Sequence, residues 1–277
     1  MSSKKLGWNR VLAGLVVMVI AVVCGVAYYS TRQHTALPTP AQKTSRPDTS
    51  KKPATTASQP AANAKSVKLP GANPFAWPTE NVTVSDPASL WVIVSKTYPL
   101  ADQHYTPTDL TKPAVAVRTD KPAEEQKLRA AAAHALEQLF AAANTAGHQL
   151  LLASGFRSYE LQQTYFANYS RSYGETAANQ FSARPGQSEH QTGWSVDISR
   201  ADRQCYLDTC FGETEAGKWL VANAATYGFI LRYPADKTAT TQYQYEPWHF
   251  RYVGTELAKA LTTSGLTLDE ARPYLTN

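Results

Sequence analysis

The chain has 277 residues, of which 43% are hydrophobic, 18% are charged and three are cysteines. This balance is typical of a folded protein and excludes a wholly disordered chain, a disulfide-dense scaffold and a zinc site of four thiolates. The net charge is +5, but residues 1–80 hold ten basic and two acidic residues, and the remainder is slightly acidic. A nucleic-acid-binding domain carries its positive charge on the folded part, so no nucleic-acid partner is expected.

The first apolar segment, residues 11–29, contains no charged side chain. As a helix it would span roughly 28 Å, close to the thickness of a bilayer core. Lys4, Lys5 and Arg10 precede it, so the positive-inside rule places residues 1–10 in the cytoplasm. We expect a single transmembrane anchor with the rest of the chain outside the cell. A cleaved signal peptide is the alternative, although residues 27–30 lack the small-x-small cleavage pattern.

Residues 30–80 have a different composition. Eight of the seventeen prolines lie between residues 38 and 78, among Ala, Thr, Ser and Lys. Such a segment buries too little apolar surface to offset the entropy of ordering it. We interpret it as an extended stalk that holds a folded domain, residues 81–277, away from the membrane.

The folded domain mixes helices and strands without a regular βαβ repeat. The β-branched and aromatic run at 90–94 predicts a strand. A capping Asp120, an early proline and acidic residues predict a helix that starts near 120 and ends at Gly147. Further along the chain we expect a strand at 149–153, helices at 159–172 and 214–227, strands at 229–233 and 248–253, and a short helix from residue 255.

These elements predict a single α+β domain with a largely antiparallel central sheet flanked by helices. The chain contains no G-x-G-x-x-G and no P-loop sequence, so no nucleotide cofactor is expected.

Two short segments, residues 188–197 and 246–249, bring together side chains that bind metals. A catalytic zinc needs three N or O ligands and one open position for water, and His190, Asp197 and His249 can supply the ligands. Glu246 could then carry the proton that the water releases. The chain has no H-E-x-x-H sequence, the helical motif that would strengthen a zinc assignment. From spacing alone, these residues could therefore also have an ordinary structural role.

Three ordered motifs turn this hypothesis into a specific one. The chain resembles the VanY-type D-alanyl-D-alanine carboxypeptidases, zinc peptidases that also include the VanX dipeptidase. The resemblance covers residues 88–262 and includes the stretches 91–100 and 227–234. Three motifs carry it: Ser-Gly-Phe-Arg-Ser at 154–158, Ser188-x-His190-x-x-Gly193-x-x-x-Asp197 and Glu246-x-Trp248-His249.

The resemblance implies a role for each matching residue. It makes His190, Asp197 and His249 the ligands of Zn²⁺ and Glu246 the general base. Arg157 would steady the carbonyl oxygen as it becomes negatively charged. The residues implied in holding the substrate, a stem peptide of peptidoglycan, are Ser188, Gln187 and Trp248.

Other functions remain open at this point. An LD-carboxypeptidase acting on tetrapeptide stems would use the same residues, and a wall-binding module could have lost catalysis. A serine DD-peptidase has little support, because S-x-x-K occurs only at Ser2 and K-T-G is missing. Cys205 and Cys210 could close a short disulfide loop in an exported domain, with a two-thiolate metal site as the alternative.

Overall fold

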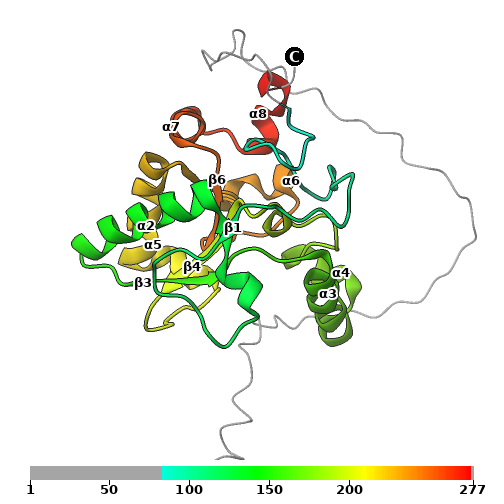
Figure 1. Cartoon of the computed structure of the whole chain (residues 1–277), viewed down its shortest axis with the longest axis horizontal. Coiled ribbons are helices and arrows are strands. Elements are labelled where there is room, and N and C mark those ends of the chain that lie inside the picture. The colour runs from blue at the N-terminus through cyan, green and yellow to red at the C-terminus, as the bar shows by residue number, and fades with distance from the viewer. Residues whose placement is uncertain (1–82, 276–277) are drawn as a thin grey trace, which may run out of the picture. The chain divides into compact units, whose positions relative to one another are not determined.

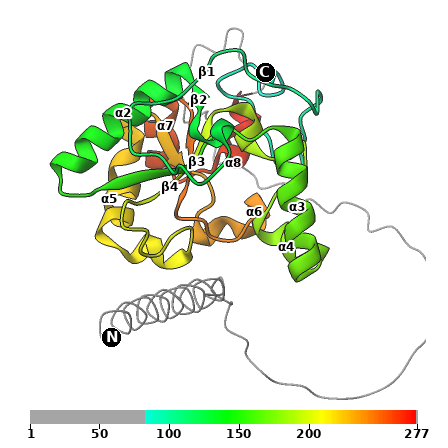
Figure 2. The same ribbon diagram turned by 60° about the horizontal axis from the view of Figure 1, so that its bottom comes forward.

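The structure, a computed structural model, describes residues 83–275 (Figures 1 and 2). The predicted cytoplasmic segment at 1–10, the anchor at 11–29 and the stalk at 30–80 lie outside the described residues. Between residues 83 and 275, no helix combines the length and the apolar character that crossing a bilayer requires.

A four-stranded antiparallel sheet lies at the centre of the domain (Figure 1). Its strands, in the spatial order β3-β4-β6-β5, are β3 (Leu150–Ser154), β4 (Ser195–Arg200), β6 (His249–Tyr252) and β5 (Phe229–Leu231). Asp197 on β4 lies directly opposite His249 on β6. The predicted α+β class with an antiparallel sheet is therefore confirmed for the described domain.

Helices and a small second sheet surround these four strands. Among the helices, α2 packs against α5, and α3 lies beside α4 at another end of the domain (Figures 1 and 2). The small sheet pairs β1 (Leu110–Thr111) with β2 (Leu128–Arg129). The helices are α2 (Ala130–Thr145), α3 (Tyr159–Tyr173), α4 (Glu175–Phe181), α5 (Glu215–Asn223), α6 (Thr238–Thr241), α7 (Thr255–Ser264) and α8 (Leu268–Leu275).

The two faces of the central sheet have opposite character. Successive side chains of a strand point to opposite faces. On β4, Val196 and Ile198 enter the main apolar core together with residues of α2 and α5. Asp197 therefore points to the other face, where its partner His249 also lies. That second face is buried as well, so the polar side chains on it are shielded from solvent.

The predicted strand at 90–94 is wrong. Val92, Ile93 and Val94 are buried, as the apolar run indicates, but they pair with no strand of the described domain. The guanidinium of Arg251 donates hydrogen bonds to the carbonyl oxygens of Leu90 and Val92, both at 2.9 Å. These carbonyls are satisfied by a side chain instead of by a neighbouring strand.

The predicted helix from residue 120 starts too early. Residues Ala123–Gln126 form one 3₁₀ turn, β2 follows, and α2 begins only at Ala130. Tertiary hydrogen bonds explain the break, because Gly155 N–H donates to the carbonyl of Glu125 and Phe156 N–H to that of Lys127. These carbonyls are therefore not available to a continuous helix.

The remaining expected elements lie where the sequence indicates, with small changes at their ends. The helix at 159–172 is α3, capped by Ser158, and the one at 214–227 is α5, capped by Thr214 and followed by a 3₁₀ turn, Ala224–Tyr227. The predicted strands at 149–153, 229–233 and 248–253 are β3, β5 and β6, and the helix from 255 is α7. The sequence patterns predict none of the strands β1, β2 and β4 and none of the helices α4, α6 and α8.

Gly155 offers a test of the break before α2. A Cβ at this position would overlap the carbonyl oxygen of Lys127, and its backbone does not need a positive φ. We expect Gly155→Ala to lower the free energy of unfolding by about 3 kcal/mol, because the overlapping atom belongs to the backbone.

Urea unfolding followed by circular dichroism measures this loss. Gly265→Ala is the control, because Gly265 has φ 67° and open space around its Cα. It should cost only the strain of the left-handed conformation, about 1–2 kcal/mol. A loss for Gly155→Ala no greater than for Gly265→Ala would contradict the proposed packing.

Candidate active site

Three side chains from separate segments meet on the polar face of the central sheet. His190 lies in a 3₁₀ turn, Glu189–Thr192, while Asp197 and His249 are paired across β4 and β6. Asp197 Oδ1 is 3.4 Å from His190 Nε2 and 3.2 Å from His249 Nδ1. One ligand atom from each residue lies within 4.8 Å of the others, and all three residues are buried.

The chemistry of this cluster fits a divalent metal. His190 Nε2, Asp197 Oδ1 and His249 Nε2 are buried and have no hydrogen-bond partner among the described residues. The other ring nitrogen of His190, Nδ1, is 2.7 Å from the carbonyl oxygen of Gly155, which can only accept. Nδ1 is therefore the protonated nitrogen, and the lone pair of Nε2 points into the cluster. Two imidazoles and one carboxylate with converging lone pairs match a catalytic zinc site with an open position.

The carboxylate of Asp197 stays ionised in this position. Burial by itself raises the pKa of Asp197, but the imidazoles of His190 and His249 close to it outweigh burial and hold this pKa well below its usual value. An ionised, partly unsatisfied carboxylate in a buried site attracts a cation.

Glu246 has the opposite electrostatic character although it lies close by. Its Oε2 is 3.7 Å from His249 Nδ1, and its side chain is buried. Burial raises the pKa of Glu246 to about 8, and the charges of His249 and Arg157 only partly oppose that shift. Glu246 lies outside the three-residue cluster. Its carboxyl group is therefore free to exchange a proton near neutral pH.

Arg157 contributes a cation to the same site. It follows β3, and its backbone N–H donates to the carbonyl of His190 at 3.2 Å. Its Nη2 is 3.9 Å from Asp197 Oδ2, and its buried Nε has no hydrogen-bond partner among the described residues. The guanidinium thus has a donor left for a group that enters the site.

A cavity of about 210 Å³ connects these residues. Ser188 and Trp248, both expected in substrate binding, line it, whereas Gln187 is not among its described lining residues. The cavity wall also contains residues that sequence reasoning missed: Lys121, Glu125, Gln162, Tyr165, Tyr169, Tyr233 and Tyr243. The four-residue spacing of Tyr165 and Tyr169 had indicated a helix face, but not that this face borders the cavity.

A short covalent loop forms another part of the wall. Cys205 and Cys210 are joined by a disulfide, with their Cα atoms 5.5 Å apart. Leu207, inside this loop, has φ 47° and lines the cavity. The disulfide restricts the loop that holds Leu207 at the site.

Comparisons with known proteins agree with this geometry. Residues 125–255 match a family described as VanY: D-alanyl-D-alanine carboxypeptidase. A Bacillus subtilis protein named "Putative carboxypeptidase YodJ" is 42% identical over 188 residues, which is 68% of each chain. This chain belongs to the VanY family. The family predicted from the three motifs is confirmed, and with it the carboxypeptidase class.

Solved structures of the VanY family share the fold. The LD-carboxypeptidase LdcB aligns with a TM-score of 0.64 and 40% identity, over 70% of this chain and 93% of LdcB. A VanY D,D-pentapeptidase from a VanB-type resistance cassette, solved with Zn(II), aligns with a TM-score of 0.53 and 32% identity, over 68% and 98% of the chains.

Metal binding should depend on pH through His249. Burial lowers the pKa of His249, but the nearby carboxylates of Asp197 and Glu189 outweigh burial and raise it to about 9. His249 is therefore protonated at neutral pH without metal, and a metal ligand must be deprotonated. We expect the Kd for Zn²⁺ to fall about tenfold per pH unit between pH 6 and pH 8, as one competing proton is removed.

Competition with a chelator, corrected for the chelator's own protonation, measures this Kd. His249→Ala should bind zinc much more weakly at every pH. His134→Ala, which removes a largely exposed histidine of α2, should keep the wild-type profile. A wild-type Kd that does not change with pH would show that no proton leaves the site on binding.

Proposed function

We propose that the chain is a zinc-dependent D-alanyl-D-alanine carboxypeptidase that removes the terminal D-alanine from peptidoglycan stem peptides. The observation that carries this proposal is the buried cluster of His190, Asp197 and His249, with Glu246 and Arg157 beside it at one cavity. The name of the matching family and the Zn(II)-bound VanY structure support the substrate and the metal.

Zinc held by His190, Asp197 and His249 would supply a Lewis acid that polarises the scissile carbonyl and acidifies water. Glu246 accepts the proton of the attacking water and returns it to the departing amine of D-alanine. Its pKa of about 8 suits both steps, because a general base works best near the pH of the reaction. Arg157 directs a fixed positive charge toward the carbonyl oxygen as it becomes negative.

The substrate chain is held by residues that line the cavity. Ser188 and Trp248 border it, and a polar Ser188 can bind the free carboxylate that a carboxypeptidase must recognise. Gln187, which does not line the cavity, has a weaker claim to such a role.

An LD-carboxypeptidase that acts on tetrapeptide stems is the second candidate. The specific observation in its favour is the alignment with LdcB, which has a higher TM-score and identity than the alignment with the D,D-pentapeptidase. The two activities would share the metal ligands, Glu246 and Arg157. A catalytically silent wall-binding module is disfavoured because it would not need a buried Glu246 beside the cluster.

We also propose that the enzyme acts outside the cell membrane. The support is the uncharged apolar run at 11–29 behind Lys4, Lys5 and Arg10. Digestion of the domain by protease added to intact cells tests this location, and full protection would contradict it.

Glu246→Gln tests the proton carrier. Removing the ionisable group should lower kcat by about 10²–10⁴-fold, the usual contribution of general acid–base catalysis. Zinc content should stay at the wild-type level, because Glu246 lies outside the ligand cluster. Glu256→Gln, at an exposed position of α7, is the control and should keep full activity. Loss of zinc together with activity would instead make Glu246 a ligand.

The substrate assay separates the candidate functions. The full chain, loaded with zinc, is incubated with a pentapeptide stem ending in D-Ala-D-Ala and with the matching tetrapeptide, and mass spectrometry reads the products. We expect the pentapeptide to lose one alanine and a chelator to abolish this loss. Cleavage of the tetrapeptide alone would establish the LD activity. No cleavage of either peptide by the zinc-loaded chain would refute the proposal.

A further inference from the structure

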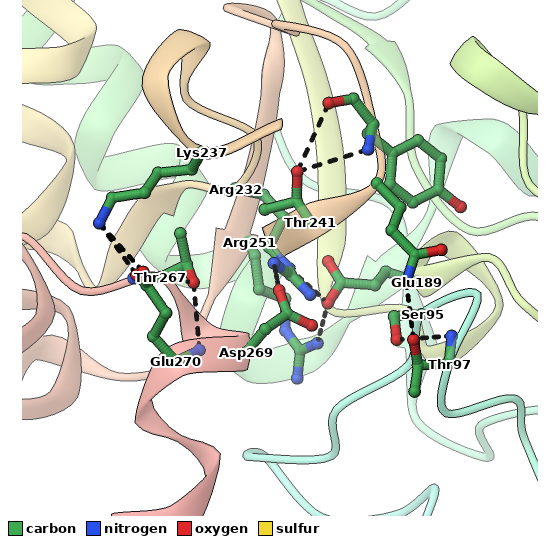
Figure 3. A network of polar contacts seen from close by, with 12 residues as sticks. Ser95, Thr97, Glu189, Arg232, Lys237, Thr241, Arg251, Thr267, Asp269 and Glu270 are labelled. Atoms are coloured by element: carbon green, nitrogen blue, oxygen red, sulfur yellow. Dashed lines mark hydrogen bonds and ion pairs between the residues drawn. The ribbon is translucent and has the colours of Figure 1, made fainter. Parts of the chain in front are cut away.

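A second carboxylate on the polar face of the sheet, that of Glu189, has no solvent exposure. Its Oε1 accepts hydrogen bonds from Arg232 Nε at 2.8 Å and from Arg251 Nη1 at 3.0 Å. Both arginine side chains are also fully buried. Figure 3 shows Glu189 beside these guanidinium groups, with Asp269 of α8 on the other side of Arg232.

This arrangement keeps Glu189 ionised. Its Oε1 lies between two guanidinium groups that both donate to it, and such charge-assisted hydrogen bonds favour an ionised acceptor. Two arginines face two carboxylates, Glu189 and Asp269, so the buried group is neutral as a whole. A neutral buried group of charges is far less costly than an unpaired one.

The other oxygen of Glu189 faces the metal cluster. Glu189 Oε2 is 3.6 Å from His249 Nε2 and accepts a hydrogen bond from Ser195 Oγ at 3.1 Å. The opposite ring nitrogen, His249 Nδ1, is the one that faces Asp197. The imidazole of His249 thus lies between two carboxylates, one on the metal side and one behind it.

An ionised carboxylate can only accept hydrogen bonds. When the His249 ring is neutral, as a metal ligand must be, Glu189 therefore favours a proton on Nε2 and leaves the lone pair on Nδ1, the nitrogen in the cluster. For His190 the carbonyl of Gly155 does the same from behind. Behind His190 this contact is a hydrogen bond of 2.7 Å, whereas His249 Nε2 makes no hydrogen bond among the described residues and has the Glu189 carboxylate 3.6 Å away. A carboxylate or carbonyl behind the outer nitrogen is the arrangement that orients metal-binding imidazoles.

We propose that Glu189 is a positioning residue for the metal: fixed by Arg232 and Arg251, it sets the ring orientation and tautomer of His249. The inference rests on the metal site of the proposed function. Glu189 borders the same cavity, but its side chain has no solvent exposure and its carboxylate is engaged by Arg232, Arg251 and Ser195, so in this role it acts through His249 and not on the substrate. Arg232 and Arg251 influence the metal site only through their contacts with Glu189.

The test measures zinc affinity and needs no substrate. The full chain, purified in detergent, is stripped of metal, and the Kd for Zn²⁺ is determined by chelator competition. We expect Glu189→Gln to weaken zinc binding by about 10–100-fold, the usual effect of losing such an outer partner. Glu189→Asp keeps a carboxylate near the arginines, but the shorter side chain moves this carboxylate away from His249. We expect this variant to fold and to bind zinc at least tenfold more weakly than the wild type.

Asp269→Asn is the matched control. It removes a carboxylate from the same buried group through its contact with Arg232, but it does not contact His249. The melting temperature of each metal-free variant reports damage to the fold. We expect Asp269→Asn to lower this temperature and leave the Kd for zinc within about twofold of wild type.

Two results would overturn the inference. One is wild-type zinc affinity in Glu189→Asp or in folded Glu189→Gln. The other is equal weakening in Asp269→Asn, which would mean that any damage to the buried group disturbs the site. If the wild type bound zinc but cleaved neither stem peptide, the proposed function would fail while the role of Glu189 could still be read from the Kd values.

Discussion

The pairing of β4 with β6, which sets Asp197 opposite His249, is the constraint on which the rest of the structure depends. Because side chains alternate along a strand, this register places Val196 and Phe250 together in the apolar core. The same register assigns two metal-binding side chains to the other face. A slip of one residue would bury the apolar residues on the wrong side and separate the ligands.

A buried polar face must satisfy its own groups, and this requirement explains most of the neighbouring contacts. Arg251 pairs with Glu189 and also satisfies the carbonyls of Leu90 and Val92, so it replaces a strand partner for that segment. Arg232 connects Glu189 to α8. His190 and Asp197 keep atoms that no described protein group satisfies, and this deficit is what a metal ion would remove.

Two carboxylates at one site have acquired opposite properties from their surroundings. Asp197 lies between imidazoles, which hold its pKa low and keep it anionic, as the proposed metal ligand must be. Glu246 is dominated by burial, which raises its pKa to about 8 and suits proton transfer. Such a divergence commonly separates a binding or stabilising carboxylate from a catalytic one.

The sequence by itself determined the family, the α+β class and the three residues of the candidate metal cluster, because motif spacing and hydrophobic periodicity are local properties of the chain. Only the tertiary structure decided what depends on distant partners. Residues 90–94 pair with no strand, and the carbonyl oxygens of Leu90 and Val92 accept hydrogen bonds from the Arg251 side chain instead. Glu189 contacts His249 because the sheet folds residue 249 onto the turn that holds residue 189. Such contacts have no signature along the sequence, since they arise from packing between segments far apart in it.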